Sequence, residues 1–250
     1  MLYNTKDTLI LSAAGCADTD PDSLESIMAG NEAGADGSCI TVDLTADGIA
    51  VLCSQGGFPT PEGFLDLREH DYFELRKAVP KIVTVGQAIE IAKYCPSKLA
   101  ITLGNTAACA AVRIALSTAN MLDRAFLYGY GMIEAARLKA QFPALHIVGD
   151  LNESPLRPAA VARAARDTGL FGLRTRPVNL TPELIAECQQ FGLVTVASET
   201  SDIDELEHLL TLGVHFIETA RPDRAYSFLP TRSAAAREAG FTAASPEAAR

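Results

Sequence analysis

The sequence lacks the patterns by which several classes of protein are recognised. Its six cysteines include no Cys-x-x-Cys pair, which argues against a zinc knuckle or a dithiol redox motif. No stretch approaches the roughly 18 apolar residues that a membrane-spanning helix needs. The turn after the first apolar segment, residues 12–16 (SAAGC), is not the Gly-x-Gly-x-x-Gly loop of a dinucleotide-binding fold. We therefore expect reduced, mostly buried thiols and no membrane span.

Positive charge is also scarce. The chain has 21 lysines and arginines against 31 aspartates and glutamates, which gives a formal net charge of -10. Nucleic acid and anionic membrane surfaces are therefore poor partners, because their phosphate groups would be repelled. Residues 1–7 contain no basic region that leads into a long apolar stretch, so we expect no secretory signal and a cytoplasmic location.

Eight short runs of apolar or β-branched residues predict eight strands. They lie at residues 8–12, 39–44, 99–103, 124–128, 145–148, 171–174, 193–197 and 216–219. The segments between them place apolar side chains at helical spacing, as in residues 85–92. Eight alternating units in 250 residues favour an α/β fold of the closed TIM (β/α)8 barrel type over an open doubly wound sheet. We expect one domain spanning residues 1–250.

Helix-boundary signals agree with this division. Thr181 before Pro182 is typical of a helix start. Asp202 and Glu205, three residues apart, resemble a capping box, and Gly213 is typical of a helix end.

The longest interval between predicted strands follows the second one. It begins with a turn at residues 45–48 (TADG) and an apolar run at 49–53, which predicts a hairpin at the barrel rim. We place this insertion at about residues 45–82. The tail, from about residue 227 to residue 250, is rich in alanine and arginine and is expected to form one short surface helix.

Several segments resemble a known family. Residues 34–37 (GADG), the strand after them and residues 44–48 (LTADG) resemble the segment G-A-D-x-x-E-x-D-x-x-L-T-x-D-G of the glycerophosphodiester phosphodiesterases. Later elements of that family are resembled by residues 74–77 (ELRK), 82–85 (IVTV), 180–184 (LTPEL), 192–194 (GLV) and 213–217 (GVHFI) with 221–223 (RPD). The resemblance covers about residues 8–226 and implies the same barrel.

The resemblance also implies a chemistry and the positions that perform it. Family members hydrolyse glycerophosphodiesters with a divalent metal held by carboxylates and with two histidines as acid and base, because the phosphoryl oxygen needs a cation and protons must be exchanged. The corresponding positions here hold other residues: Ala13 and Ala14 for the first histidine and its arginine, Asp22 for a glutamate, Cys39 and Thr41 for the metal carboxylates, Ser54 and Gln55 for the second histidine and its aspartate, and Thr102 and Gly104 for a third carboxylate and a lysine. We therefore expect no catalytic residues at these positions, no metal and no other cofactor.

The four histidines do not replace the missing pair. His146 and His215 precede predicted strands and belong at the bottom of the barrel, and His208 lies within a predicted helix. His70 lies in the insertion, from which it could reach the barrel mouth.

Charged residues remain at the predicted top face. Arg174 and Arg176 end the sixth predicted strand, Glu218 ends the last one, and Asp150 and Glu153 follow the fifth. Two interpretations stay open. The arginines, two residues apart, would point to one side of the strand and bind a phosphate or carboxylate, or they and Glu218 would form ion pairs at the rim.

These observations leave three hypotheses. The first is a degenerate family member, a pseudoenzyme that binds a partner or a small anionic ligand such as a phosphate ester. The second is an active phosphoric diester hydrolase of lipid or glycerol metabolism, with calcium or magnesium held by a site rebuilt from Asp150, Glu153, Glu199 and Glu218. The third is a structural subunit, and assembly into a homo-oligomer stays open under all three.

Overall fold

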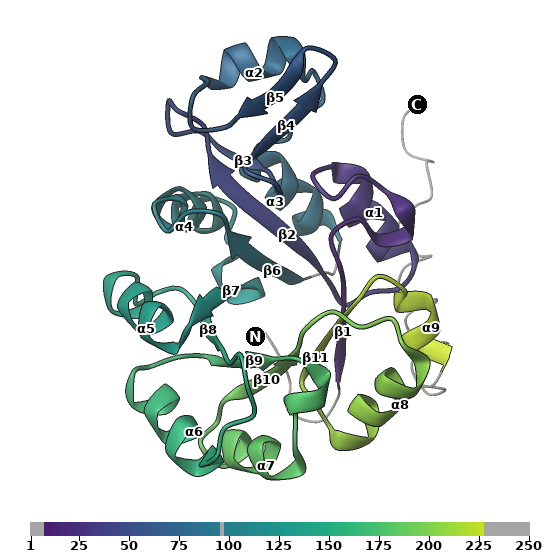
Figure 1. The fold of residues 1–250 in the computed structure, drawn as a ribbon, viewed down its shortest axis with the longest axis vertical. Helices are drawn as coiled ribbons and strands as arrows, with labels where there is room; N and C mark the ends of the chain where they lie inside the picture. Colours follow the sequence, from purple (N-terminus) through teal and green to yellow (C-terminus); the bar gives the residue numbers. More distant parts are fainter. Residues whose placement is uncertain (1–7, 96–97, 228–250) are drawn as a thin grey trace, which may run out of the picture.

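The computed structural model describes residues 8–95 and 98–227, and its centre is a closed ring of eight parallel strands (Figure 1). β1 pairs with β2 on one side and with β11 on the other, which closes the ring. In ring order the strands are β1 (Leu9–Ser12), β2 (Gly37–Leu44), β6 (Lys98–Leu103), β7 (Ala125–Gly131), β8 (Ile147–Asp150), β9 (Gly172–Thr175), β10 (Val194–Ala197) and β11 (Phe216–Thr219). The predicted TIM barrel is confirmed.

Helices cover the outside of the ring, as Figure 1 shows. They are α1 (Leu24–Glu32), α3 (Val85–Tyr94), α4 (Ala108–Thr118), α5 (Met132–Gln141), α6 (Pro158–Asp167), α7 (Pro182–Gln190), α8 (Ile203–Leu212) and α9 (Pro222–Ser227), with short 3-10 turns η1 (Cys16–Asp18), η2 (Leu122–Arg124) and η3 (Pro177–Asn179). The Thr181 side chain accepts a hydrogen bond from the Leu184 amide, and Asp202 accepts one from Glu205, so both predicted helix starts are confirmed. Among the helices of the described residues, none is both long and apolar enough to cross a membrane.

The insertion contains more structure than the sequence predicts. β3 (Ala50–Leu52) runs antiparallel to β2 outside the ring, which confirms the predicted hairpin. Beyond it, β4 (Gly57–Thr60) pairs with β5 (Gly63–Asp66), and α2 (Tyr72–Ala78) follows, all at the top of Figure 1. These elements share a small core, which includes Val51, Phe58, Leu67, Leu75 and Ile82. The predicted tail helix lies outside the described residues.

The lower part of the ring is filled with apolar side chains. Phe126 is fully buried there, with its ring centroid 5.1 Å from that of Phe216 and 6.1 Å from that of Phe171. Gly172 lies on the wall of this lumen, where a Cβ would come within 2.3 Å of the Val194 carbonyl oxygen. All six cysteines are free and five of them are buried. The charged side chains of Asp150, Arg174 and Glu218 lie at or near the carboxyl ends of their strands, which is the face where TIM barrels carry their sites.

Candidate functional site

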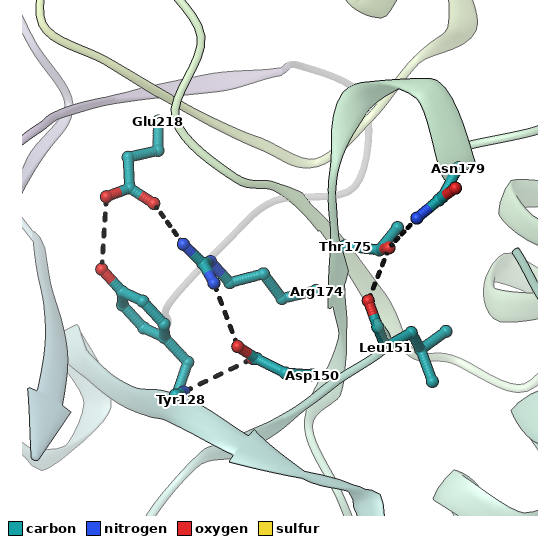
Figure 2. A network of polar contacts seen from close by, with 8 residues as sticks. Tyr128, Asp150, Leu151, Arg174, Thr175, Asn179 and Glu218 are labelled. Carbon is teal, nitrogen blue, oxygen red and sulfur yellow. Dashed lines mark hydrogen bonds and ion pairs between the residues drawn. The ribbon is translucent and has the colours of Figure 1, made fainter. Parts of the chain in front are cut away.

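Four side chains form a charged network inside the mouth of the barrel (Figure 2). Arg174 Nη1 lies 3.0 Å from Asp150 Oδ2, and Arg174 Nη2 lies 3.1 Å from Glu218 Oε2. The Tyr128 hydroxyl donates to Glu218 Oε1 at 3.4 Å, and the guanidinium carbon of Arg174 lies 4.5 Å from the centroid of the Tyr128 ring. Tyr128, Asp150, Arg174 and Glu218, here called the mouth network, connect strands β7, β8, β9 and β11.

Strand register and side-chain length bring these groups together. Asp150 and Arg174 are paired residues of the adjacent strands β8 and β9. Alternation along β9 turns Leu173 outward into the core beneath the helices and Arg174 inward. The arginine is long enough to reach β11, which is not a neighbour of β9 in the ring. The backbone amide of Gly129 adds a longer contact to Asp150 Oδ1, at 3.4 Å.

The three charged side chains of the mouth network are largely buried. The side chains of Asp150, Arg174 and Glu218 are 19 %, 19 % and 10 % exposed. Burial raises the pKa of Asp150, an effect that Arg174 partly offsets. Burial opposes the charge of Arg174, but Glu218, Tyr128 and Asp150 outweigh it and raise the pKa of the guanidinium. The terminal nitrogens of Arg174 are thus committed to two carboxylates, and its buried Nε has no hydrogen-bond partner among the described residues.

Glu199, which the rebuilt-site hypothesis includes, follows β10. Burial, and then the negative charge of Glu218, raises the pKa of its carboxyl group. The mouth therefore combines one internal cation with three carboxylates. Glu153 is exposed and lies in the connection after β8.

The positions that the family resemblance assigns to metal ligands lie beside the mouth network. Thr41 on β2 is paired with Thr102 on β6, which is paired with Tyr128 on β7. Cys39 is buried in one cluster with Tyr128, and burial raises the pKa of its thiol well above the usual value, an effect to which the negative charge of Glu218 adds. A protonated thiol and two hydroxyls do not fit calcium or magnesium, which prefer carboxylate and carbonyl oxygens. Within the described ranges, no three His, Cys, Asp or Glu side chains are placed to hold a metal ion together.

Three further assigned positions, Ala13, Ala14 and Gly104, also carry no group that could bind a metal or transfer a proton. Ala13 is buried directly after β1, with Ala14 next to it half-buried. Gly104 follows β6, and a Cβ there would lie 2.6 Å from Asp43 Oδ2, so a longer side chain requires Asp43 to move.

Asp22 and Ser54 meet on the side of the mouth next to the insertion. The amide and hydroxyl of Ser54 donate to Asp22 Oδ2 at 3.0 Å and 3.1 Å. Burial raises the pKa of Asp22. Together with Gln55 they line a cleft of about 710 Å³ between the start of α1 and the insertion. The cleft thus offers a carboxylate and a hydroxyl where the family places a carboxylate and a histidine.

The histidines lie away from the mouth network. His146 precedes β8 and its ring packs 4.8 Å from that of Phe171, and His215 precedes β11 and accepts a hydrogen bond from the Thr195 amide. Burial lowers the pKa of both imidazoles. His208 lies in α8, and His70 Nδ1 contacts the Asp66 carbonyl oxygen inside the insertion.

Arg176 differs from Arg174, although both line one pocket. This pocket of about 140 Å³ also includes Asp150, Asn152 and Ser198. Arg176 is exposed, and its side chain forms no ion pair or hydrogen bond with another described residue. Two residues that were not among the predicted site residues, Thr175 and Asn179, fix this region. Thr175 donates to the Leu151 carbonyl oxygen at 2.8 Å, and Asn179 donates to Thr175 Oγ1 at 3.1 Å (Figure 2). The Thr-Arg-Pro-Val-Asn segment, which begins at the last residue of β9, is the local signal for such a loop.

Comparisons with known proteins establish what this barrel is similar to. No protein-family model and no curated protein sequence matches the chain. A glycerophosphodiester phosphodiesterase from Parabacteroides distasonis matches with a TM-score of 0.76 and 20 % identity, over 92 % of this chain and 100 % of that one. One from Thermotoga maritima matches with 0.76 and 17 % identity, over 92 % and 100 %. An Oleispira antarctica phosphodiesterase in complex with the product sn-glycerol-3-phosphate matches with 0.74 and 17 % identity, over 89 % and 96 %. The chain therefore has the fold of the glycerophosphodiester phosphodiesterases.

Proposed function

We propose that this chain is a ligand-binding barrel with the fold of the glycerophosphodiester phosphodiesterases and that it does not hydrolyse phosphodiesters. The observation that carries the proposal is the mouth network, in which Arg174 holds Asp150 and Glu218 while the assigned metal and proton-transfer positions carry thiol, hydroxyl and methyl groups. Hydrolysis of this kind needs a cation at the phosphoryl oxygen and groups that exchange protons near neutral pH. Neither Cys39 nor the hydroxyls at positions 41 and 102 provide them.

The proposed ligand is a small anion such as a phosphate ester, bound in the pocket beside Arg176. Asp150 and Glu218 already neutralise Arg174, so Arg176 supplies the uncompensated positive charge. Asn152 and Ser198 add neutral polar groups to the same pocket. A guanidinium fork suits phosphate or carboxylate geometry. The Oleispira antarctica protein holds glycerol 3-phosphate on a barrel of this fold, which makes that compound the first ligand to test.

Purified protein is expected to release no glycerol 3-phosphate from glycerophosphocholine or glycerophosphoethanolamine with calcium, magnesium or manganese present. The measurement is an enzyme-coupled assay for glycerol 3-phosphate, with an active glycerophosphodiesterase as the positive control. Turnover that a chelator abolishes would refute the proposal.

Such turnover would favour the alternative function, an active phosphoric diester hydrolase rebuilt from Asp150, Glu153, Glu199 and Glu218. One observation supports this alternative. Burial raises the pKa of both Asp150 and Glu199, and a raised carboxyl pKa is a property of proton-donating catalytic groups. Under the alternative, Glu199→Gln abolishes the turnover. Under our proposal there is no turnover for it to change.

Replacement of Arg176 by alanine is expected to weaken glycerol 3-phosphate binding about tenfold. The reason is the loss of one charge-assisted contact, worth about 1.5 kcal/mol at an exposed site. Calorimetry at low ionic strength measures the change. Arg166→Ala is the matched control, because Arg166 is also exposed but lies in the last turn of α6 and does not line the pocket. Equal affinity of the Arg176→Ala and Arg166→Ala proteins would remove Arg176 from the proposed site.

A further inference from the structure

Exposed apolar side chains collect around one part of the barrel mouth. Four large apolar residues, between 42 % and 101 % exposed, each follow a different strand of the ring: Ile133 after β7, Leu156 after β8, Val178 after β9 and Ile203 after β10. These four strands are consecutive in the ring. The carboxyl ends of parallel barrel strands share one face, so the four side chains lie along one arc of the mouth. We call them the apolar rim.

The loop that carries Val178 is fixed in place. Thr175 and Asn179, at its two ends, are buried and hydrogen-bonded to each other, and Thr175 also binds the Leu151 carbonyl oxygen in the preceding connection (Figure 2). Between them, Arg176 and Val178 are exposed. The loop thus buries its polar residues and presents one cation and one apolar side chain to solvent.

An open hollow with both apolar and polar lining residues adjoins the pocket of Arg176. It has a volume of about 450 Å³, and Met132, Ile133 and Leu151 are its apolar lining residues. It shares Asp150, Leu151 and Asn152 with the smaller pocket that contains Arg174 and Arg176. A ligand can therefore place a charged group at Arg176 and an apolar group against Ile133 at the same time.

The pocket of Arg176 and the hollow together form a groove, and the charges along this groove restrict the ligand further. Glu153 and Glu134 also line the hollow, and Glu134 is paired with Arg137 at 3.2 Å. A second anionic group in the hollow would be repelled by these carboxylates, whereas an uncharged chain would not be repelled. The groove is therefore complementary to one anion at the end of an apolar chain.

We propose that the ligand is amphiphilic, a phosphate ester of a straight-chain alcohol, with its phosphate at Arg176 and its chain in the hollow and along the apolar rim. This inference rests on the proposed function, since it names the ligand class of the same site. Exposed apolar groups that cluster on a water-soluble surface mark interaction sites. Removing a methylene from water favours binding in proportion to the area buried.

Calorimetry with methyl, butyl and octyl phosphate, each below its micellar concentration, tests the inference. The affinity is expected to rise about two- to fourfold for each methylene that the hollow buries, fourfold being the effect of complete burial. Ile133→Ser and Val178→Ser are expected to reduce this dependence on chain length. Ile114→Ser is the matched control, because Ile114 is 57 % exposed on α4 and does not line either pocket.

The outcomes separate this inference from the proposed function. Equal affinity for the three phosphates would overturn the amphiphile and leave phosphate-ester binding intact. No binding of any of them at millimolar concentration would overturn both. Binding to phosphatidylcholine vesicles without binding to octyl phosphate would assign the apolar rim to a membrane surface and would also overturn the inference.

Discussion

Replacement of Arg174 by alanine is expected to lower the free energy of unfolding by about 3 to 5 kcal/mol, the range for breaking a buried ion pair by removing one partner. The substitution leaves Asp150 and Glu218 without their counter-ion, in a mouth that also contains Glu199. It also removes the guanidinium that packs over the Tyr128 ring. Urea denaturation at pH 7.5 measures the loss. Arg176→Ala is the control, because Arg176 is exposed and outside the mouth network, and it is expected to change stability by no more than about 0.5 kcal/mol.

The loss caused by Arg174→Ala is expected to depend on pH. Without the guanidinium, burial and the negative charge of Glu218 raise the pKa of Asp150 further above that of the unfolded chain, about 3.9. A carboxyl group with a raised folded-state pKa destabilises the protein once pH exceeds the unfolded value. The difference between variant and parent is therefore smaller at pH 4.5 than at pH 7.5. A deficit that does not vary with pH would mean that Arg174 contributes packing and little charge compensation.

The barrel could be predicted from the sequence because its signals are local. The last strand is an apolar run followed by Glu218 and Thr219, and the structure has β11 at the predicted residues. Strand β7, which the fourth predicted run covers, shows where such local signals fail. The run at 124–128 predicts its start, but β7 continues to Gly131 through a register shift between Leu127 and Tyr130. Pairing with β8 keeps this Gly-Tyr-Gly segment in the sheet, although its composition is not typical of a strand.

The second half of the insertion could not be predicted either, because its conformation also depends on contacts with distant segments and not on local composition. β4 contains Pro59, and β5 has few buried residues, so neither segment resembles a strand by itself. Their partners decide their conformation. Phe58 packs in a cluster with Leu67 and Leu75, which come from segments later in the chain.

The sequence located the charged residues of the mouth and allowed ion pairs of the arginines with Glu218, but it did not separate Arg174, which forms the pair, from Arg176, which does not. Spacing of two residues suggests that Arg174 and Arg176 are equivalent, but β9 ends at Thr175 and the chain turns at Pro177, so Arg176 leaves the strand. The partners of Arg174 lie 24 and 44 residues away along the chain. Only the closed ring brings them within reach of one guanidinium.

Introducing a carboxylate at position 39, where the family resemblance assigns a metal ligand, is expected to be costly, because the mouth network lies directly beside that position. Cys39 is 5 % exposed and lies in one buried cluster with Tyr128, and the negative charge of Glu218 raises the pKa of its thiol. In Cys39→Glu, the new carboxylate would be added to Asp150 and Glu218 around a single guanidinium. We expect a loss of about 3 to 5 kcal/mol at pH 8, the size of a buried charge without its own partner.

Cys39→Gln separates the charge of this substitution from its size. Glutamine has nearly the shape of glutamate, so it is expected to lose only the cost of overpacking, about 1 to 3 kcal/mol. The buried glutamate has a raised pKa, so the difference between the two variants should widen as pH rises from 5 to 8 in urea denaturation. Equal stability at pH 8 would mean that the mouth accepts the carboxylate, and this result would support the hypothesis of a rebuilt metal site. The expected divergence would instead mean that the mouth, with Arg174 already paired with Glu218, does not accept a further carboxylate at position 39.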